Sequence, residues 1–287
     1  MMKSISKFAA SFILLAASGL CSESFIVGDL MGQFANQMFV VAATTSLALD
    51  HGATPLFPDF KNRSDLGLPK NYKNVFYHLN ANDPWVPIEY CYIEPHFYYD
   101  PITYRPNMQI RGWFQSEKYF KHHKQEIMDL FAPHPEIVEY LTEKYMDVIS
   151  HPKTVSIHYR YYGNEEYDCS AYAICDLDYY QTAINLFPED SLFVVFSNKI
   201  EWCKENFAHI PRNFLFVEGE AYHYDFYLMS MCKDNIICNS SFSWWAAYLN
   251  LNPDKRVIVP PHWFSEKYEG LNNTKDLIPP EWQILKE

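Results

Sequence analysis

The segment NSSFSWWAAYLN, residues 239–250, places hydroxyl side chains directly before an apolar run. Serine side chains accept hydrogen bonds from the first amides of a helix, so Ser240 and Ser241 predict a helix start. Phe242 and Trp245 then fall on one helical face. The segment is either a capped, buried helix or an anion site. A helix start suits an anion because its first N–H groups are unpaired and its dipole is positive there.

A second candidate is the strand-like segment VSIHYR, in which His158 and Arg160 are two residues apart. Side chains at this spacing lie on one face of a strand, so both are expected to face the same cleft. A planar guanidinium can pair two phosphate oxygens and stabilise a departing diphosphate, which makes Arg160 the first candidate for catalysis. The alternative is a structural ion pair of Arg160 with Glu165 or Glu166.

The elements that must position these residues form an alternating pattern from Lys153 onward. The predicted strands are TVSIHY, SLFVVFS, FLFVE, NIICN and RVIVP. Strands separated by helices imply a parallel sheet with right-handed crossovers. Such sheets bind ligands at the carboxyl ends of their strands, which is where residues 239–243 lie. This placement favours the anion site over the purely structural helix.

The loop MGQFANQM follows the apolar run FIVGDL and precedes a helical pattern that Gly52 ends. This order of strand, loop and helix is typical of the start of a nucleotide-binding α/β domain. The helical segment before residue 151 is interrupted by His151 and Pro152. We therefore predict an α/β protein with one domain over residues 25–151 and a second over residues 152–287. The loops after their strands are expected to converge on one crevice.

Composition restricts the function. The net charge of -12, without a run of Lys or Arg, excludes a nucleic-acid surface. No Cys or His spacing suits a zinc site, so no metal is expected. The aromatic stretch YCYIEPHFYYD, residues 90–100, is either a surface that packs against sugars or a covering loop. Cys238 lies in an apolar run and is expected to be buried.

Residues 1–24 have the layout of a secretory signal peptide or signal anchor, with Lys3 and Lys7 before an apolar stretch over residues 8–20. That stretch is shorter than the roughly 20 residues that span a bilayer, which favours cleavage. A membrane is contacted only through this segment, if it is retained. The expected location is the lumen of the secretory pathway or a membrane-anchored position, with export if the protein is bacterial.

Five segments in order resemble the α-1,2-fucosyltransferase family, glycosyltransferase family 11. They are GQFANQMF, RGWFQSEKYF, VSIHYR, FVVFSNKIEWCKENF and DFYLMSMCKDNIICNSSFSWWAAYLN. The likeness extends from about Phe25 to the closing LIPPEWQIL. It implies a GT-B-like fold, with two Rossmann-like domains facing a nucleotide-sugar cleft. It also implies that GDP-L-fucose is a substrate bound mainly by the second domain, that the acceptor lies toward the first, and that no metal or cofactor takes part.

The resemblance also implies roles for single residues. The His-x-Arg motif of the family falls on His158 and Arg160, the catalytic candidates. The donor-binding positions of the family fall on Gly32, Asn36, Gln37, Ser240, Ser241 and Phe242. The implied reaction moves L-fucose from GDP-β-L-fucose to the 2-hydroxyl of a galactose-terminated glycan, with inversion.

The sequence departs from the family pattern in and near these motifs, where an extra Tyr162 precedes Gly163 and Gln33 stands where Gly or Arg is usual. Tyr161 stands where a second arginine is usual, Ala35 where a glycine is usual, and Asn198 where an acidic residue is usual. These departures keep two alternatives open. One is a catalytically weakened relative that binds glycans or GDP without transfer, and the other is a transferase for another GDP-sugar.

Several acidic residues have more than one interpretation. An inverting transfer needs a base that deprotonates the acceptor hydroxyl. The candidates are Glu165, Glu166 and Asp168, which follow the His-x-Arg motif in the sequence. Asp225 either reads the guanine N1–H and amino group or caps a helix. Asp176, in the sequence DLD, is interpreted as a helix cap rather than a metal ligand.

Overall fold

The computed structural model describes residues 24–80, 84–163 and 171–286. The predicted leader, apart from Ser24, and the base candidates Glu165, Glu166 and Asp168 lie outside these residues. In the described part, no helix combines the length and the apolar character needed to cross a membrane.

The first sheet has four parallel strands in the order β2-β1-β4-β3. These are β1 (Phe25–Gly28), β2 (Thr54–Leu56), β3 (Tyr90–Ile93) and β4 (Met108–Arg111). Its helices are α1 (Phe34–His51), α2 (Asp59–Asn62) and α3 (Leu68–Asn74). The predicted strand, loop and helix unit at the start is confirmed. β2 and β3 were not predicted, and β3 lies in the aromatic stretch that was expected to be a sugar-packing surface or a covering loop.

The second sheet has six parallel strands in the order β10-β9-β8-β5-β6-β7. They are β5 (Thr154–Tyr159), β6 (Leu192–Ser197), β7 (Asn213–Phe216), β8 (Asp234–Ile236), β9 (Val257–Val259) and β10 (Gln283–Ile284). The helices between them are α7 (Leu177–Ile184), α8 (Ile200–Phe207), α9 (Tyr222–Met231) and α10 (Ser241–Leu249), and the short α11 (Glu266–Glu269) lies between β9 and β10. The predicted βα alternation and parallel pairing are confirmed.

The connection between the sheets is less regular than predicted. The segment SEKYFKHHKQEIMDLF, residues 116–131, has a pattern that predicts one helix capped by Ser116. In the structure it is divided into η1 (Glu117–Tyr119), η2 (Lys121–His123) and α4 (Lys124–Leu130). Ser116 does cap this segment, because its hydroxyl accepts a hydrogen bond from the Lys118 amide at 3.3 Å. Helices α5 (Pro135–Lys144) and α6 (Met146–Ser150) follow, and the proposed domain boundary falls between α6 and β5.

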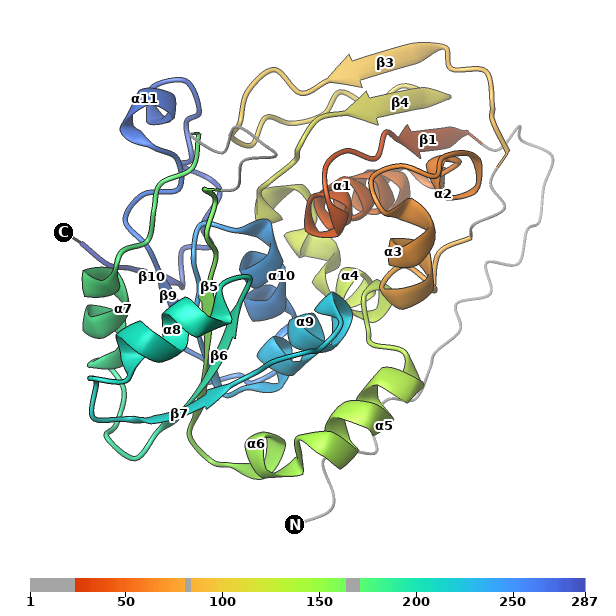
Figure 1. Ribbon diagram of the computed structural model, residues 1–287. Coiled ribbons are helices and arrows are strands. Elements are labelled where there is room, and N and C mark those ends of the chain that lie inside the picture. The colour runs from red at the N-terminus through yellow and green to blue at the C-terminus, as the bar shows by residue number, and fades with distance from the viewer. Residues whose placement is uncertain (1–23, 81–83, 164–170, 287) are drawn as a thin grey trace.

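Aromatic packing joins the two sheets. Helices α1 and α10 lie between the sheets and contact each other (Figure 1). The Phe39 ring of α1 lies 4.6 Å from Trp244 and 4.9 Å from Trp245 of α10, measured between ring centroids. Both tryptophans are completely buried. A single hydrophobic core therefore fixes the first loop of the chain relative to the start of α10.

Candidate active site

The start of α10 lies at the carboxyl edge of the second sheet. Ser240 has an extended backbone, and its hydroxyl accepts a hydrogen bond from the Phe242 amide at 3.3 Å, so the predicted cap is confirmed. The first-turn amides of Ser241 and Ser243 have no partner within the helix. Ser240, Ser241 and Phe242 are all partly exposed. The cap and the anion site are therefore compatible, and donor binding here stays a prediction.

The His158 side chain is enclosed rather than open to a cleft. Its ring is 6% exposed and lies 5.2 Å from the ring of Phe242, between centroids. Its Nδ1 atom is 3.2 Å from the Sγ atom of Cys238, which is fully buried, as predicted. Burial, with a smaller effect of the Arg160 charge, lowers the pKa of His158 to about 3. His158 is thus neutral at physiological pH, and its ring packs near Phe242 at the start of α10.

Arg160 follows the last residue of β5 and is exposed. The expectation that His158 and Arg160 share one open face is therefore wrong, because His158 is buried whereas Arg160 is exposed. The guanidinium carbon of Arg160 lies 5.9 Å from the centroid of the Tyr162 ring. No carboxylate among the residues the structure describes pairs with this guanidinium.

The loop that carries Arg160 is tied to its surroundings by the residues that depart from the family pattern. The Tyr161 amide donates to Oδ1 of Asn198 at 2.9 Å, and Nδ2 of Asn198 donates to the Tyr161 carbonyl at 3.0 Å. An ionised carboxylate could accept but not donate, so asparagine suits this double contact. Asn198 therefore positions the loop, and the Tyr161 side chain is left 37% exposed.

Tyr162 brings the Arg160 loop to the start of α10. Its hydroxyl donates to the Asn239 carbonyl at 2.9 Å, and its ring stacks on Tyr172 at 4.4 Å between centroids. Burial raises the pKa of Tyr162 well above its usual value. Asn239 is itself buried, and its Nδ2 donates to the carbonyls of Ala173 and Trp263, each at 2.7 Å. No motif in the sequence predicted this link, and the extra Tyr162 before Gly163 was its only signal.

The loop between β1 and α1, which contains Gly32, forms the side of the candidate site opposite the Arg160 loop. Gly32 has φ +64, and a Cβ atom there would lie 2.6 Å from Nδ2 of Asn36 and 3.1 Å from the Trp113 ring. The backbone conformation and the close packing both require glycine. Asn36 is partly exposed, and its Oδ1 accepts from Nε2 of Gln115 at 2.9 Å. Ala35 is buried in the core, so its methyl group does not enter the cleft.

Gln37 cannot bind a donor through its side chain in this structure. It is completely buried, and Nε2 donates to the carbonyls of Gly32 at 2.8 Å and Leu66 at 3.0 Å. Its Oε1 accepts from Nδ2 of Asn71 at 3.0 Å. The structure therefore corrects the expected role of Gln37, which holds the Gly32 loop in place.

Three phenylalanine rings bring the two sides of the site together. Phe34 at the start of α1 contacts Phe242 at 5.4 Å and Phe226 at 5.2 Å, between centroids. Phe226 contacts Phe242 at 5.5 Å. Phe242, a predicted donor-binding residue, thus contacts both other rings in an aromatic cluster that links α1, α9 and α10.

The two aspartates with open interpretations are now distinguished. Ala221, not Asp225, is the N-cap of α9, so the capping interpretation of Asp225 is wrong. Oδ1 of Asp225 is buried and has no hydrogen-bond partner among the described residues. Burial, and then the charge of Glu220, raises the pKa of Asp225 to about 7. Asp176 accepts from the Tyr179 amide at 2.9 Å, and its predicted cap is confirmed.

One group among the described residues has metal-ligand spacing. The ligand atoms of Asp50, His122 and His123 lie within 4.8 Å of one another. Asp50 is near the end of α1, whereas Gly32 precedes its start, so this group is remote from the site. The five described cysteines, Cys91, Cys175, Cys203, Cys232 and Cys238, are free thiols.

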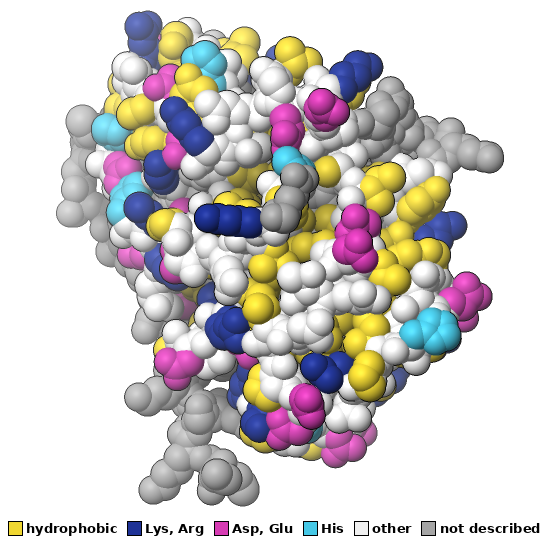
Figure 2. Space-filling view, turned by 90° about the vertical axis from the view of Figure 1, so that its left-hand side faces the viewer, with side chains coloured by type: hydrophobic (Ala, Val, Ile, Leu, Met, Phe, Trp, Pro, Cys, Tyr) yellow, Lys and Arg dark blue, Asp and Glu magenta, His cyan; other side chains and the backbone are white. Residues whose placement is uncertain are grey.

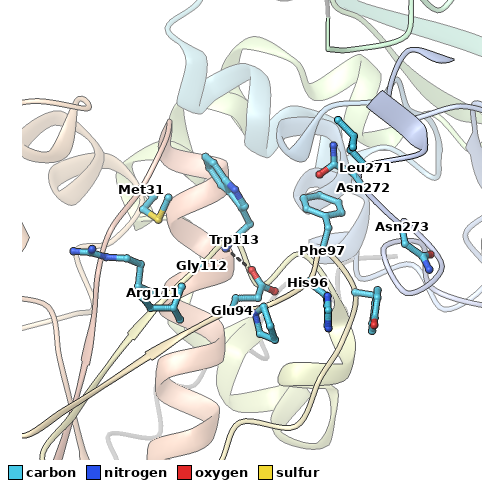
Figure 3. Close-up of a pocket in the computed structure, with 13 residues that line it drawn as sticks. Met31, Glu94, His96, Phe97, Arg111, Gly112, Trp113, Leu271, Asn272 and Asn273 are labelled. Carbon is cyan, nitrogen blue, oxygen red and sulfur yellow. Dashed lines mark hydrogen bonds between the residues drawn. The ribbon is translucent and has the colours of Figure 1, made fainter. Parts of the chain in front are cut away.

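A cavity of about 420 Å³, which no sequence motif indicated, lies at the carboxyl edge of the first sheet. Its walls include Glu94, Phe97 and Trp113 (Figure 3). Figure 2 views this side of the molecule and shows hydrophobic side chains gathered across its middle, with charged side chains of both signs scattered around them. The aromatic stretch at residues 90–100 and the Trp of RGWF were the available signals. Nothing in the sequence distinguished Glu94.

Comparisons with known proteins agree with the motifs. The sequence profile of glycosyl transferase family 11 matches residues 21–286. An α-1,2-colitosyltransferase of Escherichia coli is 34% identical over 190 residues, which are 63% of each chain. A galactoside α-(1,2)-fucosyltransferase 2 of Oryctolagus cuniculus is 25% identical over 263 residues, 83% of this chain and 70% of the relative. This chain spans 63% and 58% of the length of two Escherichia coli relatives.

The fold also matches solved structures. The α-1,6-fucosyltransferase NodZ, soaked with GDP-fucose, aligns with a TM-score of 0.53 and 14% identity over 79% of this chain and 92% of that chain. Such a likeness concerns the fold alone, and it confirms the predicted GT-B-like α/β architecture. Because the family profile covers the chain from residue 21 to residue 286, this protein belongs to glycosyltransferase family 11.

Proposed function

We propose that this protein transfers L-fucose from GDP-β-L-fucose to the 2-hydroxyl of a galactoside, with inversion to an α-linkage. The observation that carries the proposal is the hydrogen bond from Tyr162 to the Asn239 carbonyl. It holds the loop of Arg160 against the start of α10. The Arg160 guanidinium and the first amides of α10 would then both contact the pyrophosphate of the donor. Negative charge grows on this pyrophosphate as GDP departs, and these groups would stabilise it.

The other parts of the donor site follow from the same placement. The Oδ1 atom of Asp225 is buried and has no hydrogen-bond partner among the described residues, and a guanine N1–H or amino group would supply the missing donor. The Gly32 loop, held by Gln37, approaches from the first sheet. The relatives named above are a colitosyltransferase and a fucosyltransferase, and both names give an α-1,2 linkage. They therefore support the proposed linkage more strongly than the proposed identity of the transferred sugar.

The alternative is a relative that binds GDP or glycans without transfer. It is favoured by the exposed Tyr161 side chain in the place of a second arginine, which leaves Arg160 as the cation of this motif. Calorimetry with GDP, combined with an assay of GDP release, separates the two functions. Micromolar GDP binding without turnover on any acceptor would favour the binding protein.

The test of the proposed reaction is a panel of donors and acceptors with the whole chain. The donors are GDP-L-fucose, GDP-colitose and GDP-mannose, and the acceptors are galactosides such as lactose together with glucosides. We expect GDP release with GDP-L-fucose and a galactoside, and a product linked at the 2-hydroxyl. If no sugar acceptor raises GDP release above the rate of donor hydrolysis, the proposal is rejected.

A further inference from the structure

The cavity beside the first sheet is built by both halves of the chain. The ends of β3 and β4 supply Glu94, Phe97 and Trp113, and residues 271–273 approach from the carboxyl-terminal half. In Figure 3 the rings of Trp113 and Phe97 lie on either side of the Glu94 carboxylate. Trp113 also packs against the Gly32 position, so the cavity adjoins the loop proposed to approach the donor.

The Glu94 carboxylate is held by neutral donors. Oε2 accepts from the amides of Trp113 at 2.7 Å and Phe114 at 3.0 Å, and Oε1 accepts from the Tyr119 hydroxyl at 3.3 Å. No Lys, Arg or His of the described residues forms an ion pair with it. Burial raises the pKa of Glu94, and these hydrogen bonds only partly oppose the effect. Oε1 carries only one long hydrogen bond, so it has capacity to accept another.

The local backbone is unusual in a way that fixes this carboxylate. Phe114 has φ +48, which is uncommon for a bulky residue. A Cβ atom at Gly112 would lie 2.4 Å from Cβ of Glu94, so only glycine lets the two strand ends approach. Strain of this kind tends to be found at functional sites. Here it aims two consecutive amides at one carboxylate oxygen.

Trp113 gives the cavity a surface suited to a sugar. The residue is 37% exposed, although tryptophan usually buries more of its surface. Aromatic faces pack against the C–H faces of pyranose rings, and a nearby carboxylate can accept hydrogen bonds from their hydroxyls. The combination of one partly exposed indole and one fixed carboxylate suits a neutral glycoside better than an anion.

We propose that this cavity is the acceptor subsite, that Trp113 is its stacking surface, and that Glu94 is the base; this inference rests on the proposed function. Oε1 of Glu94 takes the proton of the acceptor hydroxyl. The acceptor oxygen forms a bond to the anomeric carbon while the bond from that carbon to the phosphate oxygen breaks. The electron pair of the broken bond leaves with GDP on the side of Arg160.

The first experiment compares Glu94→Gln with the wild type and with Glu89→Gln, a control at an exposed glutamate just before β3. Glutamine keeps a carbonyl oxygen for the two amides, so the variant is expected to fold. Transfer to lactose should fall by about 100-fold or more, since a general base contributes about that much. GDP affinity and donor hydrolysis should stay within about twofold of the wild type. Normal transfer by Glu94→Gln would overturn the proposal.

The second experiment does not depend on turnover. Saturation-transfer NMR with lactose should show binding to the wild type and to Trp85→Ala, which changes a tryptophan that is 58% exposed and does not line the cavity. The signal should be lost in Trp113→Ala. Lactose binding that survives in Trp113→Ala, or no lactose binding to the wild type, would overturn the acceptor subsite. Lactose binding here without turnover of any GDP-sugar would instead reject the proposed function alone.

Discussion

The Nδ1 atom of His158 lies 3.2 Å from the Sγ atom of Cys238, where β5 ends and just beyond the end of its neighbour β8. Both side chains are buried, and the His158 ring lies 5.2 Å from the ring of the partly exposed Phe242, between centroids. The His158–Cys238 pair is therefore part of the buried layer that underlies the candidate site. The histidine of the His-x-Arg motif is therefore buried in this protein, and the arginine is its exposed member.

His158 should make stability depend on pH. Its pKa falls from 6.5 to about 3 on folding, so between these values the unfolded state binds a proton that the folded state does not. The free energy of unfolding should therefore fall as the pH drops below 6.5, by up to about 1.4 kcal/mol per pH unit. Urea denaturation of His158→Gln should show a shallower dependence. The exposed His209→Gln is the control, and equal slopes in both variants would contradict the prediction.

Arg160→Ala should abolish most transfer without unfolding the protein. An exposed side chain past the end of a strand contributes little to the core, so the free energy of unfolding should change by less than about 0.5 kcal/mol. The turnover number should fall by about 10²–10³-fold, the effect of removing a group that stabilises departing charge. Arg160→Lys keeps the charge but loses the planar fork, and it should recover only part of the rate. Full activity in Arg160→Ala would exclude the proposed role.

Ser240 should contribute to stability and to donor binding separately. Ser240→Ala removes the cap of α10 and should cost about 1 kcal/mol, whereas Ser240→Gly should cost only a few tenths. Thermal unfolding measures this difference. If the hydroxyl also contacts phosphate, calorimetry should show weaker GDP binding in both variants. A loss of affinity in Ser240→Ala alone would trace the effect to helix stability instead.

Asp225→Asn should stabilise the free protein and weaken GDP binding. Because the pKa of Asp225 is raised from 3.8 to about 7, the folded state holds a proton that the unfolded state releases. Stability is thus lost as the pH rises between those values, and Asn should restore on the order of 2 kcal/mol at alkaline pH. GDP affinity should fall by about 10–100-fold if the carboxylate binds guanine. In the wild type, GDP binding should release a proton near neutral pH, which calorimetry in two buffers detects.

Phe39→Ala should destabilise both sheets together. Its ring packs on Trp244 and Trp245, so the cavity left behind should cost about 3–5 kcal/mol. Leu49→Ala, at a position of the same helix that is 41% exposed, should have little effect. Circular dichroism and tryptophan fluorescence should report one coincident transition for Phe39→Ala. Two separated transitions would mean that the sheets unfold independently.

The sequence determined much of the second sheet. Its strands are short apolar runs separated by helical segments, and such alternation has one common solution, a parallel sheet with polar loops at the carboxyl edge. The helix caps at Asp176 and Ser240 could also be predicted, because each cap is a hydrogen bond between residues close together in the sequence. β3 was missed because Pro95 and the surrounding aromatics resemble a loop, and its pairing with β4 is not a local property.

Only the tertiary structure decided which site residues are exposed. Period-two spacing relates His158 to Arg160 but does not say that the strand ends at Tyr159. The partners of Gln37 lie 29 and 34 residues away, at Leu66 and Asn71, and no local pattern reports them. Burial and hydrogen bonding over such separations arise from packing of the whole chain. For the same physical reason Glu94 became a candidate only when Gly112 and Trp113 were seen beside it.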